Sequence, residues 1–182
     1  MKKFLKRLIC DYIPNHLVNK IPFYYFRNIY YRYLMGIEIG KNSSLHMNIF
    51  IEGTYPFSKR FKIGNFTSIG RNSTLDSRGK LIIGNSVSIS PNVKILTAQH
   101  KINTKMFDGE NKSVVIEDYV WIGTGAIILP GVTLEKGSVI AAGSIVTKDV
   151  KAFTVVGGNP AKFIKNREKN LEYKCIYKPW FD

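Results

Sequence analysis

Three histidines are the side chains of this 182-residue sequence that exchange a proton near neutral pH without a special environment. His16 and His46 lie in the first third of the chain. His100 stands where the segment Ile95–Lys101 leads into a polar excursion that runs to about Ser113. Excursions from a regular framework are where binding and catalytic residues concentrate. We therefore expect His100 to act as a general base.

The framework around His100 is set by a strict six-residue repeat. Its first position holds Ile116, Ile122, Ile128, Leu134, Ile140 and Val146, and its fifth holds Val120, Ala126, Val132, Ser138 and Ser144. A period of six cannot be a helix face, whose apolar stripe recurs every 3.6 residues. It predicts an all-β solenoid in which each hexad is one short strand and a corner, with the first and fifth residues inside. Three hexads would close one triangular turn.

The repeat also divides the chain. Looser hexads begin at Ile39, Ile63 and Ile83, so we expect the solenoid domain over residues 37–156. The excursion after His100 would be an inserted loop over residues 100–115, placed at a corner of the solenoid.

A metal centre is not expected on this solenoid. A metal-dependent carbonic anhydrase would need three zinc-ligating histidines, and two of the three histidines lie outside the relevant turns. Cys10 and Cys175 also lack the spacing of metal ligands, and we expect them to be reduced thiols in a cytoplasmic protein.

Residues 1–36 form a separate segment in which seven Lys and Arg residues oppose only Asp11, and an aromatic band runs over residues 23–33. Pro14 and Pro22 divide it into short helical pieces. One interpretation is a cap over the open first turn of the solenoid. The other is a foot that contacts anionic lipid at the inner membrane face. The two roles are compatible. We interpret the basic N-terminus as uncleaved, because its apolar stretch is short and interrupted.

Residues 157–182 form the exit from the solenoid. Asn159 as N-cap and Pro160 at the first helical position predict a helix from Ala161 to about Glu172, followed by a tail.

The net charge of +14 indicates an anionic partner such as a phosphorylated cofactor, a lipid headgroup or an acidic glycan. Nucleic acid is not favoured, because no motif that reads DNA or RNA is visible. No stretch is long and apolar enough to predict a transmembrane helix.

Three blocks of the sequence resemble the hexapeptide-repeat acyltransferases, specifically the branch of maltose, galactoside and xenobiotic O-acetyltransferases. The blocks are Ile89–Val93 leading to Thr97–His100, then Val120–Ala126, then Gly157–Lys162. The resemblance covers about residues 37–167. It implies a left-handed parallel β-helix that assembles as a homotrimer. It also implies direct transfer of an acetyl group from acetyl-CoA to an acceptor hydroxyl, with His100 at the position of the family's base.

The resemblance further implies that acetyl-CoA lies in a groove between adjacent subunits. The positions that match its contacts are Trp121, Gly123, Thr124, Ala141, Ala142, Gly143, Thr147, Lys162 and Lys165. The first three would lie beside the pantetheine arm, the small residues would let it approach the backbone, and the lysines would lie near the phosphates. For each small residue taken alone, packing between coils is the better explanation. Asp76 matches a polar position on the acceptor side.

These observations predict a trimeric, CoA-dependent O-acetyltransferase acting on a small or lipid-linked sugar, plausibly in surface polysaccharide assembly. Such an enzyme would be cytoplasmic, with or without a peripheral contact at the inner membrane face. The alternatives are a β-helical scaffold that binds an anionic partner without catalysis, and an N-acyltransferase acting on an amino sugar. The sequence does not choose between acetyl and longer acyl groups.

Overall fold

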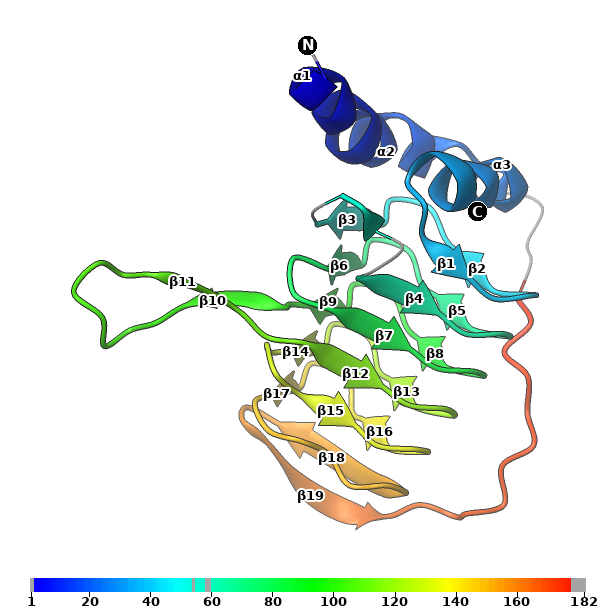
Figure 1. Cartoon of the computed structure of the whole chain (residues 1–182). Coiled ribbons are helices and arrows are strands. Elements are labelled where there is room, and N and C mark those ends of the chain that lie inside the picture. The colour runs from blue at the N-terminus through cyan, green and yellow to red at the C-terminus, as the bar shows by residue number, and fades with distance from the viewer. Residues whose placement is uncertain (1, 54, 58–59, 178–182) are drawn as a thin grey trace.

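The computed structural model describes residues 2–53, 55–57 and 60–177, and the chain folds as a left-handed parallel β-helix preceded by short helices (Figure 1). This confirms the fold class that the repeat and the family resemblance predicted. Successive strands rotate through three sheets, so each strand pairs with a strand one turn away.

Three sheets form the three sides of the solenoid. Sheet A contains β1 (Glu38–Ile39), β4 (Phe61–Ile63), β7 (Leu81–Ile83), β12 (Val114–Ile116) and β15 (Thr133–Leu134). Sheet B contains β2 (Ser44–Leu45), β5 (Ser68–Ile69), β8 (Ser88–Ile89), β13 (Trp121–Ile122), β16 (Val139–Ile140), β18 (Thr154–Gly158) and β19 (Ala161–Asn166). Sheet C contains β3 (Phe50–Glu52), β6 (Thr74–Asp76), β9 (Lys94–Ile95), β14 (Ile127–Ile128) and β17 (Ile145–Val146).

The core is built by the repeat as predicted. All residues at its first and fifth positions from Ile116 to Val146 are buried. Each buried aliphatic side chain contributes roughly 1.5–3 kcal/mol relative to an exposed one. The corners require small residues: a Cβ on Gly64 would lie 2.5 Å from the carbonyl carbon of Gly84 in the next turn. Core and corners together fix the stacking of the turns.

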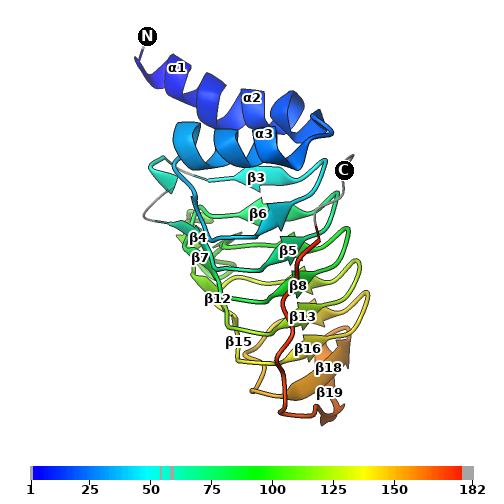
Figure 2. The ribbon, with the colours of Figure 1, turned by 90° about the vertical axis from the view of Figure 1, so that its right-hand side faces the viewer.

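Short helices lie across the first turn of the solenoid (Figure 2). They are α1 (Lys2–Arg7), η1 (Leu8–Tyr12), α2 (Ile13–His16), η2 (Val18–Lys20), α3 (Tyr24–Ile29) and η3 (Tyr30–Leu34). Within the described part of the chain, none of the helices has the length and apolarity that a membrane span needs.

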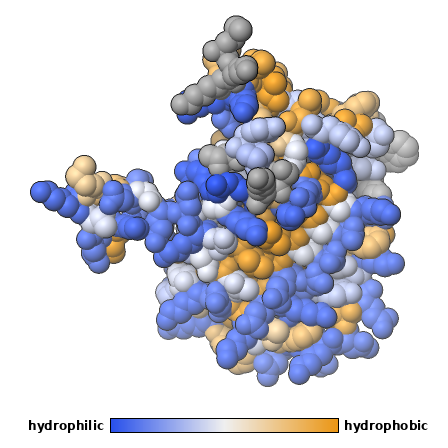
Figure 3. All heavy atoms as spheres, viewed as in Figure 1, coloured by the Kyte–Doolittle hydropathy of each residue, from blue (hydrophilic) through white to orange (hydrophobic). Residues whose placement is uncertain are grey.

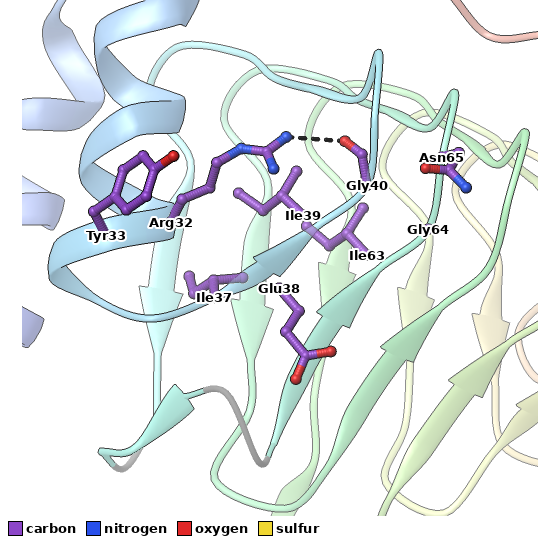
Figure 4. A pocket seen from close by; sticks show the side chains of 9 residues that line it. All are labelled: Arg32, Tyr33, Ile37, Glu38, Ile39, Gly40, Ile63, Gly64 and Asn65. Atoms are coloured by element: carbon purple, nitrogen blue, oxygen red, sulfur yellow. Dashed lines mark hydrogen bonds between the residues drawn. The ribbon is translucent and has the colours of Figure 1, made fainter.

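The helices supply hydrogen-bond partners to the backbone of the first turn. The Asn15 side chain both donates to the Ile51 carbonyl and accepts from the Ile51 N–H, each at 2.8 Å. Buried Arg27 donates to the Leu45 carbonyl, and Arg32 donates to the Gly40 carbonyl at 2.9 Å (Figure 4). An open solenoid end exposes unpaired backbone groups, and these contacts satisfy several of them.

The excursion that begins at His100 forms an antiparallel hairpin of β10 (Ala98–His100) and β11 (Gly109–Asn111). We call residues 98–111 the arm. It leaves the solenoid between β9 of sheet C and β12 of sheet A, and it projects away from the body of the molecule (Figures 1 and 3).

The prediction of a helix from Ala161 to about Glu172 is wrong. Ala161–Asn166 forms β19, which turns back after Pro160 and pairs antiparallel with β18. Gly158, with φ of +102°, starts this reversal. The capping pattern at Asn159–Pro160 favours a helix only locally, whereas the last strand of the solenoid offers an unpaired edge, and tertiary pairing overrides the local preference.

After β19 the chain runs back along the molecule. Residues 167–177, which we call the strap, follow the corner between sheets A and B (Figure 2). Arg167 donates to the carbonyl oxygens of Tyr119 and Gly137, and the Tyr177 ring stacks on His46. The expected tail continues to residue 182, but residues 178–182 lie outside the described residues.

Candidate active site

The imidazole of His100 is held by the arm itself. Its Nδ1 lies 2.7 Å from the carbonyl oxygen of Phe107, and the two rings stack with centroids 4.2 Å apart. A carbonyl oxygen only accepts hydrogen bonds, so Nδ1 carries a proton in this contact. In the neutral imidazole Nε2 is then unprotonated, and this nitrogen can take a proton from another group.

The arm can hold this pair because its two strands are in register. His100 pairs with Gly109, and the Lys101 N–H donates to the Asp108 carbonyl at 2.9 Å. Phe107 adopts a left-handed conformation, with φ of +49°, at the turn back towards His100. The hairpin therefore presents the Phe107 carbonyl and ring on the same side as the imidazole.

Asp76 lies at the root of the arm with a fully buried side chain. Its carboxylate accepts hydrogen bonds from the Arg78 guanidinium and from the Thr97 N–H, which lies 2.9 Å away. Burial alone would raise the pKa of Asp76, but the hydrogen bonds from Arg78 and Thr97 outweigh it and hold the pKa below its ordinary value. The hydrogen bond between the Arg78 and Asp76 side chains also raises the pKa of Arg78.

The residues expected to line the donor site gather at the corner between sheets B and C. The Gly123 N–H donates to Ile140, and the Gly143 N–H donates to the Thr124 carbonyl at 2.8 Å. A Cβ on Gly123 would lie 2.6 Å from the Ala142 nitrogen, so two turns meet closely here. Ala142 and Gly143 are exposed on this surface.

An outward-facing row crosses sheet B from this corner to the end of the solenoid. Trp121 pairs with Val139, Val139 with Val155, and Val155 with Lys165. Three strand spacings of about 4.8 Å place the backbones of Trp121 and Lys165 roughly 14 Å apart. Lys162 pairs with Gly157 on the same hairpin, and both lysines are exposed. The row thus runs from an aromatic ring to a cluster of positive charge.

One chain does not bring all predicted residues together. Trp121, Gly123, Thr124, Ala141, Ala142, Gly143, Lys162 and Lys165 lie on sheet B or at its corner with sheet C. His100 stands on the arm at the corner between sheets C and A. Thr147 follows β17 at the same corner as His100, and Asp76 is the last residue of β6 at that edge of sheet C. A whole side of the triangle separates His100 from the Trp121 surface.

Four residues of this arrangement escaped the sequence reasoning. Phe107 holds the imidazole, Arg78 and Thr97 hold Asp76, and Ser90 accepts a hydrogen bond from the Trp121 indole at 3.3 Å. An aromatic residue inside a polar excursion was a usable signal for Phe107. Arg78 lies two residues from Asp76, so this local spacing was a usable signal as well. Nothing in the sequence indicated Thr97 and Ser90, because their contacts join different turns. Among the described residues no group of three or more side chains forms a metal-ligand cluster.

Comparisons with known proteins identify the family of the chain. Residues 113–148 match the family described as bacterial transferase hexapeptide (six repeats). The galactoside O-acetyltransferase of Lactococcus lactis is 42% identical over 57% of this chain and 51% of its own length. An Escherichia coli acetyltransferase assigned provisionally to colanic acid biosynthesis is 32% identical over 74% of this chain and 71% of its own length.

A hexapeptide-repeat acetyltransferase of Vibrio cholerae, solved with acetyl-CoA, superposes with a TM-score of 0.81 at 30% identity. That alignment covers 92% of this chain and 90% of the Vibrio protein. By contrast, the matched part spans about half the length of the first curated relatives. On the repeat, the fold and these matches, the chain belongs to the hexapeptide-repeat acetyltransferases.

Proposed function

We propose that this protein transfers an acetyl group from acetyl-CoA directly to a hydroxyl of a sugar or glycan intermediate, with His100 as the general base. The observation that carries the proposal is the contact between His100 Nδ1 and the Phe107 carbonyl, which leaves Nε2 as the basic nitrogen. Membership of a family of acetyltransferases supplies the reaction class.

The chemistry follows from this tautomer. Nε2 takes the proton of the acceptor hydroxyl as its oxygen attacks the thioester carbonyl, because a sugar hydroxyl is a poor nucleophile at neutral pH. Collapse of the tetrahedral intermediate breaks the carbon–sulfur bond, and the imidazolium returns the proton to the departing thiolate. No covalent enzyme intermediate is needed, since holding both substrates in one complex supplies much of the rate. A backbone N–H of the coil surface would stabilise the oxyanion.

The row across sheet B is the proposed donor surface. Trp121 and the small residues Ala142 and Gly143 would lie along the pantetheine arm, and Lys162 and Lys165 would attract the phosphates. Thr147 would contribute a polar contact from its own corner. The Vibrio relative holds acetyl-CoA on the same fold, which supports this assignment.

The separation of His100 and Trp121 within one chain supports an assembly of several copies, which we propose to be the homotrimer that the family resemblance implies. If one chain cannot place the base beside its own donor surface, the arm must reach the donor surface of a neighbour. Two tip residues, Ile102 and Met106, are 84% and 77% exposed and would be covered by such a contact. Sedimentation tests this: a stable and fully active monomer would contradict the proposal.

The acceptor is proposed to be a sugar in surface polysaccharide assembly, free or lipid-linked. The names of the relatives, a galactoside acetyltransferase and one assigned to colanic acid, support a carbohydrate. A mostly apolar hollow of about 890 Å³ between the N-terminal helices and β3, lined by Leu8, Phe50 and Arg78, gives room for the non-reacting part of a lipid-linked acceptor.

The N-terminal helices are proposed to contact anionic lipid at the inner face of the membrane as well as covering the first turn. They expose the large apolar and aromatic side chains Phe4, Leu17, Tyr25 and Tyr33, and the basic side chains of Lys6 and Arg7 are exposed as well. Aromatic rings and basic side chains on one surface are what an interfacial segment needs. The enzyme would then be cytoplasmic and peripheral.

A coupled assay separates the alternatives. Acetyl-CoA and a panel of neutral, amino and nucleotide sugars are supplied, the released CoA thiol is measured, and the product is identified by mass. O-acetylated product from the wild type and little from His100→Ala supports the proposal. N-acetylated product alone would make the protein an N-acyltransferase. No thiol release with any acceptor would favour a binding scaffold.

A further inference from the structure

The arm depends on its root for its direction. It joins the solenoid through Leu96–Thr97 on one side and Lys112–Ser113 on the other. Within the described residues, the His100 ring contacts Phe107, which belongs to the arm itself. Whatever orients the root therefore orients the imidazole as well.

Residues 76–79 brace both sides of this root. Asp76 accepts from the Thr97 N–H at 2.9 Å, and the Gly79 N–H donates to the Thr97 hydroxyl at 2.9 Å. The Lys112 N–H in turn donates to the Thr97 carbonyl at 2.8 Å. A Cβ on Gly79 would lie 2.7 Å from the Lys112 carbonyl oxygen, so the brace touches the returning side of the arm too.

Arg78, which also pairs with Glu52, keeps the Asp76 carboxylate ionised. The Arg78 guanidinium donates Nε and Nη2 to the two Asp76 oxygens at 3.1 Å each, and its Nη1 lies 3.1 Å from Glu52. Glu52 and Asp76 are neighbours in sheet C. A buried carboxylate is costly unless it is paired and hydrogen-bonded, and here the two oxygens accept from four donors: the Arg78 Nε, Nη2 and backbone N–H, and the Thr97 N–H.

The solenoid itself does not require a carboxylate at this position. Leu75 pairs with Ile95, and Ile95 pairs with Ile128 in the following turn. The residues that come next along the chain, Asp76, Leu96 and Leu129, therefore occupy equivalent places in successive turns. Leucine thus fills the equivalent place in the next two turns. What distinguishes the Asp76 turn is the arm, which begins beside it.

We propose that Asp76 is a positioning residue that fixes the direction of the arm, and hence of His100, through the Thr97 N–H. Arg78 and Glu52 act behind it as the ion pair that keeps the carboxylate charged and in place. Both oxygens of Asp76 are used inside the chain, so this role replaces a direct contact with the acceptor. The effect on rate rests on the proposed function of His100, whereas the effect on the arm does not.

Asp76→Leu, which supplies the side chain that the next two turns carry, is the main test variant. Hydrogen–deuterium exchange of the peptide covering residues 96–112 should become faster, while exchange in the turns from residue 116 onward stays unchanged. Asp118→Asn is the matched control, because Asp118 also accepts from a backbone N–H of a neighbouring turn, that of Asn85, but at another corner. Unchanged exchange of the arm in Asp76→Leu would overturn the proposal whatever the protein catalyses.

Kinetics separate positioning from acceptor binding. Asp76→Leu should lower kcat by roughly ten- to a hundredfold, the usual cost of displacing a catalytic group by about 1 Å, with an unchanged KM for the acceptor. Asp76→Asn, which keeps an oxygen for Thr97, should recover part of that loss. In a His100→Ala background Asp76→Leu should cost less than about twofold more, because both changes act through one group. A raised acceptor KM, or a full further loss in that background, would show a direct contact instead.

Discussion

The regular turns of the solenoid and the arm follow opposite rules. In the turns, the first and fifth side chains of each hexad are buried and the backbone bonds repeat from turn to turn. In the arm, β10 and β11 have only each other as ladder partners, and the tip residues stand in solvent. Stability therefore resides in the turns, and the proposed proton transfer in the arm. Substitutions in one should leave the other nearly intact.

His100→Ala should have the largest effect on rate. Removing a general base lowers acetyl transfer by roughly 10²–10⁴, while the unfolding transition and the affinity for CoA stay unchanged because, among the described residues, the ring packs on Phe107 of the arm and not in the solenoid core. Single-turnover kinetics and calorimetric titration with CoA measure the two quantities. A loss smaller than tenfold would mean that water or another group takes the proton.

Ile128→Ala tests the opposite region. Its side chain is fully buried in sheet C, and removing such a side chain costs about 2–5 kcal/mol of unfolding free energy. Chemical denaturation at constant oligomer concentration measures this cost. The folded fraction should keep a kcat within about twofold of the wild type, because the backbone carbonyl of Ile128, which accepts from the Leu96 N–H at the root of the arm, is kept in the variant. A large drop in kcat without a loss of stability would break the division between the two regions.

Substitutions in the N-terminal helices test a third region, which is separate from both the regular turns and the arm. Replacing Lys2, Lys3, Lys6 and Arg7 with Gln removes up to about 1 kcal/mol of lipid attraction each, although the side chains of Lys2 and Lys3 are not among those the structure describes. Partitioning onto anionic vesicles at low salt should fall by two to three orders of magnitude, and high salt should weaken wild-type binding. Equal recovery of both proteins in the pellet, or of neither, would leave these helices as a cover for the first turn.

The two exposed lysines at the end of sheet B should give the smallest effect. Exposed charge pairs contribute about 0.2–1 kcal/mol each, so Lys162→Gln with Lys165→Gln should raise the KM for acetyl-CoA by about two- to thirtyfold. The kcat should be unchanged. Lys169→Gln is the control, because it removes an exposed charge just beyond β19. A similar rise for the control would mean that only net charge matters.

The sequence predicts the solenoid well because one repeating rule decides it. Ile116 to Val146 needed only their period to be placed inside, and the break at His100 marked the arm. The exit was mispredicted because Asn159–Pro160 is a local helix signal, while the partner that made Ala161–Asn166 a strand is the solenoid edge. The root of the arm was missed for the same reason: the contacts of Asp76 with Thr97 and of Arg78 with Glu52 join different turns, and no local spacing encodes them.

If His100 of one chain acts on acetyl-CoA bound at the donor surface of another, two inactive variants should restore each other's activity when they are mixed. His100→Ala lacks the base, and Ala142→Trp fills the exposed donor surface. When the two are co-refolded in equal amounts, random trimers combine an intact arm with an intact neighbouring surface at about a quarter of the sites. The mixture should therefore recover about a quarter of the wild-type activity. Mixed trimers without any recovered activity would place the base and the donor surface in the same chain.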